Sequence, residues 1–259
     1  MVQTAKERAV RLAVIGGSGL YRLDESAPAE TFLIHTPYAA EAVELSLEHT
    51  ASGAVWFLPR HGRDHSRAPH LIDYRANLWA LREAGVDTVI AVNAVGGIGD
   101  DMQPGTLVLP EQLIDYTWGR EHTFFSGVHA LDKHVDFTWP YDRELIGVLQ
   151  QTAAMLDLPA YRGAVYGCTQ GPRLETAAEI RRMQRDGCDI VGMTGMPEAG
   201  LARELGIRYA CMALVVNRAA GLGADAITHE EVARHLRDGI GSVRALLMAA
   251  LPQLRDVRP

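Results

Sequence analysis

The sequence predicts an α/β fold: a single three-layer domain in which helices flank a mixed, largely parallel sheet. Short apolar runs, the pattern of buried strands, alternate along the chain with segments whose apolar residues recur at helical spacing. No internal repeat, low-complexity stretch or proline- and serine-rich linker divides the 259 residues. One α/β domain can accommodate this length and bury a large core.

Seven apolar runs have the length of strands, and most are closed by glycine, proline or a polar residue. The first, Arg-Leu-Ala-Val-Ile, ends at a glycine turn. Residues 93–97 (Asn-Ala-Val-Gly-Gly) are interpreted as the turn after the third run. In chain order the predicted strands are residues 11–15, 54–58, 88–92, 105–109, 163–166, 189–193 and 209–216.

Five segments are predicted to be helices. Residues 71–84 have apolar side chains at helical spacing, and Gly85 suits the position after the last turn. The last helix, 228–251, starts with Thr-His-Glu-Glu, which matches a capping box. The others are residues 143–156, residues 174–185 and a helix that begins at Pro197; residues 115–142 are predicted to be a long loop.

Composition excludes several classes of protein. With 25 Lys and Arg against 32 Asp and Glu, the net charge of −7 provides no broad positive field for nucleic acid or an anionic membrane. No apolar run reaches the ~18 residues of a transmembrane helix. Three cysteines without a CxxC motif (Cys168, Cys188 and Cys211) argue against a disulfide framework or a zinc ribbon. Residues 1–10 are expected to be a flexible tail rather than a signal peptide, before a domain of residues 11–259 in a cytoplasmic protein.

Small, polar or cationic residues follow five of the predicted strands. In open α/β sheets, ligands bind outside the carboxyl ends of the strands. Backbone N–H groups beside glycine, a hydroxyl and one arginine can together hold a phosphate without a basic surface. We therefore predict an anion site from Gly16-Gly17-Ser18, Arg60-His61, Asn93-Ala94, Thr194 and Asn217.

Each motif taken alone has a structural alternative. The first glycine turn matches neither GxGxxG, GxSxG nor a P-loop. His61 and His65 could ligate a metal, but they lack a third ligand nearby, and no metal is expected. Asn217 could be a local backbone cap, Met193 could fill the core, and Glu175 could be a solvated charge at a helix start.

Six segments, which lie within residues 13 to about 250, together match the motifs of a known family. They are residues 16–20 (Gly-Gly-Ser-Gly-Leu), 60–62 (Arg-His-Gly), 74–77 (Tyr-Arg-Ala-Asn), 93–97, 171–176 (Gly-Pro-Arg-Leu-Glu-Thr) and 192–198 (Gly-Met-Thr-Gly-Met-Pro-Glu). On these segments the chain resembles the methylthioadenosine/methylthioinosine phosphorylase branch of the trimeric purine nucleoside phosphorylase superfamily.

The resemblance implies phosphorolysis of a purine nucleoside to the free base and a (thio)ribose 1-phosphate. Inorganic phosphate would be a co-substrate, and neither a cofactor nor a metal is required. Met193 would contact the ribose and the purine, and His134 would reach the sugar pocket of a neighbouring subunit in a homotrimer. The implied phosphate shell consists of Ser18, Arg60, His61, Asn93, Ala94 and Thr194.

The sequence departs from the adenine-specific members at the purine end. Their Thr-Asp-x-Asp pattern is replaced here by Val-Asn-Arg-Ala, which places Asn217 and Ala219 beside the base. An Asn amide can donate to O6 of a 6-oxopurine and accept the proton that N7 acquires. Glu175 can accept from N1–H, which adenine lacks, and Asn93 is also typical of the inosine and guanosine enzymes. Asn217 and Glu175 are therefore the predicted catalytic, base-binding residues of an enzyme for 6-oxopurine nucleosides.

The 5′ end of the sugar is left open between two substituents. The branch favours a methylthio group, whereas His229, at the start of the last helix, favours a hydroxyl; a solvent-facing His229 is the structural alternative. Two other functions also remain: a methylthioadenosine phosphorylase with altered adenine contacts, and a non-catalytic nucleoside-binding protein.

Overall fold

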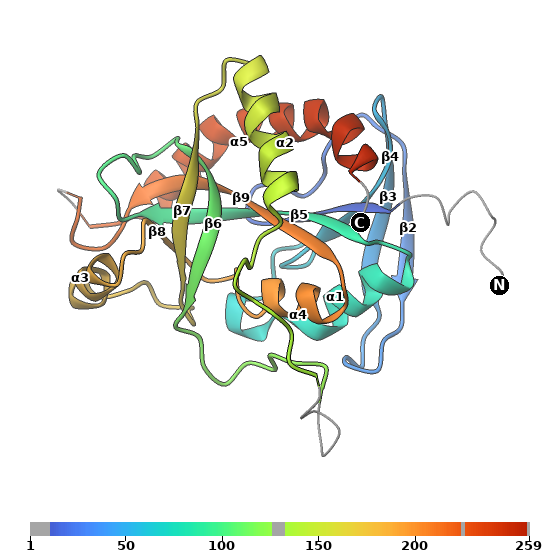
Figure 1. Cartoon of the computed structure of the whole chain (residues 1–259), viewed down its shortest axis with the longest axis horizontal. Coiled ribbons are helices and arrows are strands. Elements are labelled where there is room, and N and C mark those ends of the chain that lie inside the picture. The colour runs from blue at the N-terminus through green and yellow to red at the C-terminus, as the bar shows by residue number, and fades with distance from the viewer. Residues whose placement is uncertain (1–10, 126–132, 224–225, 258–259) are drawn as a thin grey trace.

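The computed structural model describes residues 11–125, 133–223 and 226–257, so the predicted tail of residues 1–10 lies outside it. Within those residues, nine strands form one mixed sheet in the order β2-β3-β4-β1-β5-β8-β7-β6-β9, and β9 also pairs with β5 (Figure 1). The strands are β1 (Leu12–Gly16), β2 (Ala29–Ile34), β3 (Val43–Thr50), β4 (Gly53–Pro59), β5 (Thr88–Gly97), β6 (Leu107–Asp115), β7 (Ala160–Cys168), β8 (Ile190–Gly192) and β9 (Arg208–Arg218).

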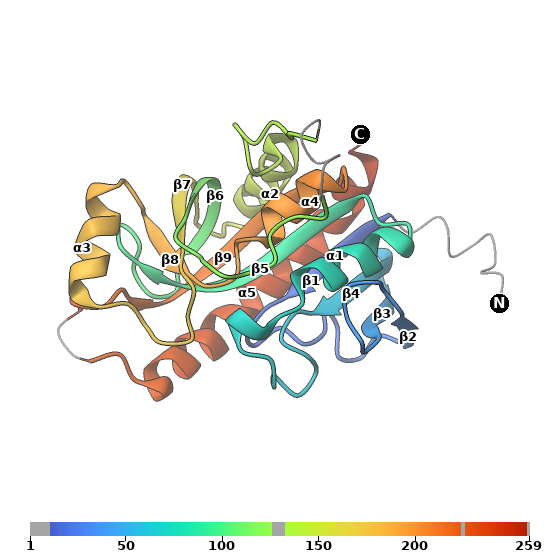
Figure 2. The same ribbon diagram turned by 90° about the horizontal axis from the view of Figure 1, so that it is seen from below.

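Helices cover both faces of the sheet. Figures 1 and 2 show α2 and α5 on one side and α1 and α4 on the other, which makes three layers. The helices are α1 (Tyr74–Glu83), α2 (Arg143–Met155), α3 (Ala177–Arg185), α4 (Glu198–Glu204) and α5 (His229–Asp256), and a 3₁₀ turn, η2, spans Pro69–Leu71. The predicted three-layer α/β fold and its five helices are confirmed. No helix in the described part of the chain is long and apolar enough to cross a membrane.

The centre of the sheet is parallel. β1 lies between β4 and β5, and β5 also runs parallel to β9. All five residues of β1 are buried, because helices cover both faces of these strands. These strands therefore end at the same edge of the sheet.

Two strands, β2 and β3, were not predicted. β2 is an edge strand that pairs only with β3 among the described strands, and its residues are mostly exposed. Charged and polar residues interrupt both segments, so neither forms the apolar run that identifies the buried strands. Their pairing along a long antiparallel register depends on contacts that a local pattern does not contain.

The turn predicted at residues 93–97 is wrong, because β5 continues to Gly97 and remains paired with β9 and β8. Close packing, rather than a turn, explains the glycines at these positions. A Cβ on Gly97 would lie 1.8 Å from the Met102 carbonyl oxygen. Likewise β9 runs to Arg218, so that Asn93 and Asn217 lie inside strands rather than after them.

Candidate active site

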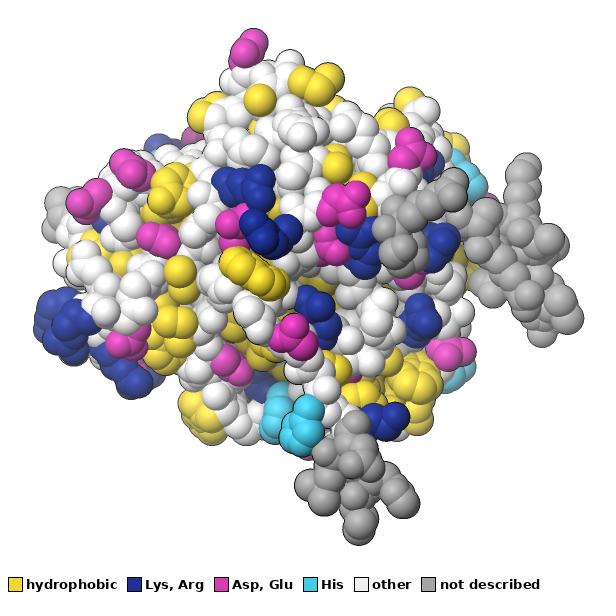
Figure 3. All heavy atoms as spheres, viewed as in Figure 1, with side chains coloured by type: hydrophobic (Ala, Val, Ile, Leu, Met, Phe, Trp, Pro, Cys, Tyr) yellow, Lys and Arg dark blue, Asp and Glu magenta, His cyan; other side chains and the backbone are white. Residues whose placement is uncertain are grey.

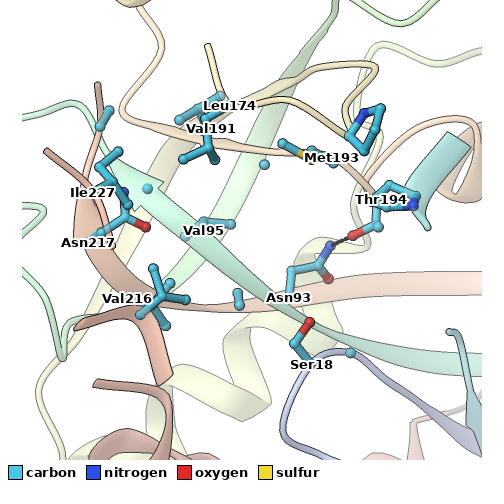
Figure 4. A pocket seen from close by; sticks show the side chains of 18 of the residues that line it. Ser18, Asn93, Val95, Leu174, Val191, Met193, Thr194, Val216, Asn217 and Ile227 are labelled. Atoms are coloured by element: carbon cyan, nitrogen blue, oxygen red, sulfur yellow. Dashed lines mark hydrogen bonds between the residues drawn. The ribbon is translucent and has the colours of Figure 1, made fainter. Parts of the chain in front are cut away.

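A cavity of about 440 Å³ lies at the carboxyl ends of β1, β4, β5 and β9. Figure 4 shows Ser18, Asn93 and Thr194 grouped toward one end and Val191, Asn217 and Ile227 toward the other. The predicted site residues that line it are Ser18, Arg60, His61, Asn93, Ala94, Glu175, Met193, Thr194, Asn217, Ala219 and His229. His134 is exposed and is absent from this lining.

Thr194 meets Asn93 because β8 runs antiparallel to β5. Gly96 pairs with Val191, and the same register continued past the end of β8 brings residue 194 opposite residue 93. Asn93 Nδ2 donates to Thr194 Oγ1 at 2.7 Å (Figure 4). Since this hydroxyl oxygen accepts, the hydroxyl proton of Thr194 is free to be donated to a ligand.

The amide of Asn93 is fully engaged inside the protein. Its Nδ2 also lies 3.4 Å from Tyr166 Oη, and its Oδ1 accepts from Arg60 Nη2 at 3.5 Å and from Cys211 Sγ at 3.4 Å. Asn93 is only 1 % exposed. Asn93 therefore connects the arginine to the threonine, and its influence on a ligand is exerted through Thr194.

A β-bulge brings two consecutive residues of β9 to the cavity. The register with β5 shifts between Val95 and Gly96, and both Val216 and Asn217 line the cavity wall. Asn217 Nδ2 donates to the Arg218 carbonyl at 2.7 Å, which turns the side-chain oxygen toward the cavity (Figure 4). This amide therefore presents a hydrogen-bond acceptor to a ligand.

Arg60 is held by Glu198, to which the sequence analysis assigned no role. Arg60 Nε and Nη2 donate to the two carboxylate oxygens of Glu198 at 2.6 and 2.8 Å, and both side chains are fully buried. Tyr209 Oη donates to the same carboxylate at 2.7 Å. Burial alone would lower the pKa of Arg60, but the Glu198 carboxylate raises it above its ordinary value. The clue in the sequence was a lone acidic residue among the small and apolar positions of 195–202.

One N–H of Arg60 remains for a ligand. Nη1 donates one hydrogen to the Val92 carbonyl at 2.8 Å, and no described residue accepts the other. Nη1 lies against Gly17, where an added Cβ would be 3.0 Å away. The glycine after β1 therefore keeps the space between Arg60 and the Ser18 loop open.

His61 is a neutral ring in this site. Its Nδ1 lies 2.9 Å from the Arg67 carbonyl oxygen, which can only accept, so Nδ1 carries the proton. Burial, with the adjacent Arg60 guanidinium and His65, lowers the pKa of His61 to about 4. At neutral pH its Nε2 is therefore an acceptor.

Glu175 precedes α3, which begins at Ala177 rather than at residue 174 as predicted. Thr169 Oγ1 donates to Glu175 Oε1 at 2.6 Å, so one carboxylate oxygen is fixed by the loop after β7. Thr169 was also missed, because nothing in its local sequence distinguishes it. Glu175 contributes to the cavity rather than being a fully solvated charge at a helix start.

The mouth of the cavity is formed by the start of α5. Thr228 caps the helix by accepting from Glu231 N at 3.2 Å, which is one of the two hydrogen bonds of the predicted capping box; the described residues do not show the return bond from Thr228 N to the Glu231 side chain. His229 is exposed and lines the cavity beside Ile227 and Val232. The mouth of the cavity is therefore lined by both a polar side chain, His229, and apolar ones, Ile227 and Val232.

Metal ligands do not cluster here. Within the described residues, no group of three or more His, Cys, Asp and Glu side chains could hold a metal ion. The rings of His61 and His65 lie with their centroids 4.6 Å apart and their planes tilted by 38°. On the face shown in Figure 3, basic and acidic side chains are interspersed, in keeping with a net charge of −7.

Comparison with known proteins identifies the family. The model of the phosphorylase superfamily matches residues 11–252. The chain belongs to this superfamily. Among its curated relatives, a probable S-methyl-5′-thioinosine phosphorylase of Pseudomonas syringae pv. tomato is 49 % identical over 92 % of this chain and 97 % of the relative. The 6-oxopurine nucleoside phosphorylase of Pyrococcus furiosus is 44 % identical over 96 % and 94 % of the two chains.

Solved structures agree with this family. The methylthioadenosine phosphorylase from Schistosoma mansoni in complex with adenine superimposes with a TM-score of 0.88 at 28 % identity, covering 96 % of this phosphorylase and 93 % of that chain. A methylthioadenosine phosphorylase from an antarctic soil metagenomic library gives 0.87 at 32 % identity, with 97 % and 88 % covered. The family resemblance predicted from the sequence is confirmed.

Proposed function

We propose that this enzyme cleaves 6-oxopurine nucleosides with inorganic phosphate, releasing the free purine and a ribose or methylthioribose 1-phosphate in nucleoside salvage. One observation carries the choice of base: an amide, Asn217, occupies the wall of the cavity where the adenine-specific pattern would place a carboxylate. The names of the relatives, which include thioinosine and 6-oxopurine phosphorylases, support the same choice.

Phosphate occupies the end of the cavity lined by Ser18, Arg60 and Thr194 in this proposal. Thr194 has a free hydroxyl proton, and Arg60 has one free N–H on Nη1. Backbone amides beside Ala94 and in the Ser18 loop complete the set of donors. Donors fixed in advance hold the dianion at attack distance from C1′ of the nucleoside and cost no reorganisation during the reaction.

The purine occupies the other end, between Asn217 and Glu175, with Ala219 and Met193 beside it. Asn217 Oδ1 accepts the proton that N7 acquires, and the second Nδ2 hydrogen is left for O6. Glu175 accepts from N1–H with the oxygen that Thr169 leaves free. Adenine has no N1–H and carries an amino group at C6, so it mismatches both residues.

The reaction exchanges one bond for another. The C1′–N9 bond breaks as an oxygen of phosphate forms the C1′–O bond, and the electron pair of the broken bond remains on the purine. Overall, the proton of hydrogen phosphate ends on the purine, and the products are the neutral base and the sugar 1-phosphate dianion. The phosphate dianion also stabilises the positive charge that develops on the sugar.

His229 binds the 5′ substituent in this proposal, and His134 of a neighbouring subunit closes the sugar pocket of a homotrimer. The exposed positions of His229 at the cavity mouth and of His134 outside it support these assignments. Ile227 and Val232 add apolar surface suited to a methylthio group. Both 5′-methylthioinosine and inosine or guanosine are therefore proposed substrates of a cytoplasmic enzyme.

A panel of four nucleosides tests the proposal: methylthioadenosine, methylthioinosine, adenosine and inosine, each with and without phosphate. We expect release of hypoxanthine that requires phosphate and exceeds release of adenine. Equal rates without phosphate would indicate a nucleosidase. Faster turnover of methylthioadenosine than of methylthioinosine would instead identify a methylthioadenosine phosphorylase, and binding without base release would identify a binding protein.

A further inference from the structure

One hydrogen-bond acceptor belongs to the same cavity lining as the donors Ser18, Arg60 and Thr194. His61 lines the cavity, and its Nδ1 proton is committed to the Arg67 carbonyl at 2.9 Å. The other ring nitrogen, Nε2, makes no hydrogen bond to any residue that the structure describes. Protonation of Nε2 is opposed by burial of the ring, by the adjacent Arg60 and by His65, whose ring centroid is 4.6 Å away.

An unprotonated nitrogen facing a fully ionised oxyanion places a lone pair against a negative oxygen. The contact becomes favourable only when the oxyanion itself carries a proton, as in the P–OH group of hydrogen phosphate. Near pH 8, hydrogen phosphate and sulfate are both tetrahedral dianions of similar size, and they differ by that single proton. A site lined only by hydrogen-bond donors would bind the two anions with similar affinity.

From this geometry we infer that His61 makes the anion site specific for a protonated oxyanion. Nε2 accepts a hydrogen bond from the P–OH of hydrogen phosphate and rejects sulfate. The inference rests on the proposed function, since that function places phosphate beside His61. It concerns binding only, and no bond is formed or broken in it.

The neighbours of His61 keep its ring in this tautomer. The adjacent guanidinium of Arg60 has donors only, so it offers no acceptor to a proton on Nε2. The carbonyl of Arg67 fixes the ring through Nδ1, because a flipped ring would place carbon against that oxygen. Buried polar mismatches of this kind discriminate by about 100-fold or more.

Anion competition on the full-length enzyme tests the inference. Base release is measured near pH 8 with phosphate or arsenate as the co-substrate, and sulfate is added as a competitor. Arsenate carries a proton at this pH, so we expect it to replace phosphate. Sulfate should compete with an inhibition constant about 100-fold above the KM for phosphate. Sulfate competing within about threefold of that KM would overturn the inference.

A pair of variants localises the effect. In His61→Gln the side-chain amide can donate as well as accept, so the ratio of the sulfate inhibition constant to the phosphate KM should fall at least about tenfold. His65→Gln changes the neighbouring ring of the same cavity and should keep the wild-type ratio. An unchanged ratio in folded His61→Gln, or an equal fall in both variants, would contradict the role of His61. If His61→Gln does not fold, the wild-type ratio decides.

These outcomes separate the inference from the function on which it rests. Base release that does not need phosphate refutes the proposed phosphorolysis. Phosphate-dependent release in which sulfate competes as well as phosphate leaves phosphorolysis standing and refutes only the selection by His61.

Discussion

Replacement of Glu198 with glutamine would leave the guanidinium of Arg60 buried without its counter-charge. The carboxylate now accepts two hydrogen bonds from Arg60, at 2.6 and 2.8 Å, and one from Tyr209 at 2.7 Å. A glutamine of the same size has only one oxygen, so an N–H group would face an N–H group of the arginine.

The expected loss of stability follows from burial of the pair. Both side chains have 0 % exposed area, and breaking a buried ion pair by removing one partner costs about 3–5 kcal/mol. For a chain of this size, about 2–4 °C of Tm corresponds to each kcal/mol, so Glu198→Gln should melt about 6–20 °C below the wild type.

Activity should change in a specific way. Displacement of the guanidinium also displaces the one N–H that Nη1 has free for an anion. We expect the KM for phosphate to rise about tenfold while the KM for the nucleoside changes by less than about threefold. A purely structural loss would reduce the amount of active enzyme and leave both KM values in place.

Thermal unfolding and steady-state kinetics of three proteins decide the matter: wild type, Glu198→Gln and the double variant Arg60→Met/Glu198→Met. The double variant has no uncompensated charge, so its loss should be limited to about 1–3 kcal/mol for the unpaired Tyr209 hydroxyl, against about 3–5 kcal/mol for Glu198→Gln. It should still bind phosphate poorly. Melting of Glu198→Gln within about 2 °C of the wild type would refute the reasoning, as would a double variant no more stable than the single one.

Three further predictions concern the base, the sugar and pH. Asn217→Asp should raise the kcat/KM ratio of adenine over hypoxanthine nucleosides by at least about 100-fold, and an unchanged ratio would remove Asn217 from the base site. His229→Met should favour methylthioinosine over inosine by about tenfold in kcat/KM, since a methionine replaces a hydrogen-bonding group with an apolar one; unchanged ratios would place His229 outside the pocket. His61 has its pKa lowered to about 4 in the native state, against about 6.5 when unfolded, so the unfolded chain binds more protons between these values and stability falls as pH decreases through that window. Urea unfolding at pH 7 and pH 5 should show His61→Gln losing about 2 kcal/mol less than the wild type, and equal losses would contradict a neutral native ring.

The predictions that succeeded rested on patterns repeated along the chain. Apolar runs and helical spacing identified seven of the nine described strands and all five described helices, but not the edge pair β2 and β3. The polar residues at strand ends identified the cavity wall. The antiparallel direction of β8 could not be predicted in this way, because the local sequence of a three-residue strand contains no signal for its direction. Thr194 lies beside Asn93 because β8 runs antiparallel to β5, and not because it follows a parallel strand as the sequence analysis assumed.

The residues that were missed act through long-range contacts. Glu198 is 138 positions from Arg60 in sequence, and only the folded chain shows that its carboxylate accepts both N–H groups. Thr169 has the same character, since its hydroxyl donates to another side chain, Glu175, at 2.6 Å. Sequence patterns therefore located the walls of the site, but they did not reveal the side chains that orient them.

The electrostatics of the proposed phosphate site follow from these contacts. The charge of Arg60 is balanced by Glu198, and His61 is neutral at physiological pH. The dianion would thus be bound by directed N–H and O–H donors without a net cation in its shell. Such a shell binds by geometry rather than by long-range attraction, so it is compatible with a chain of net charge −7. It also favours release of a sugar phosphate product, because no uncompensated positive charge retains the product's dianion.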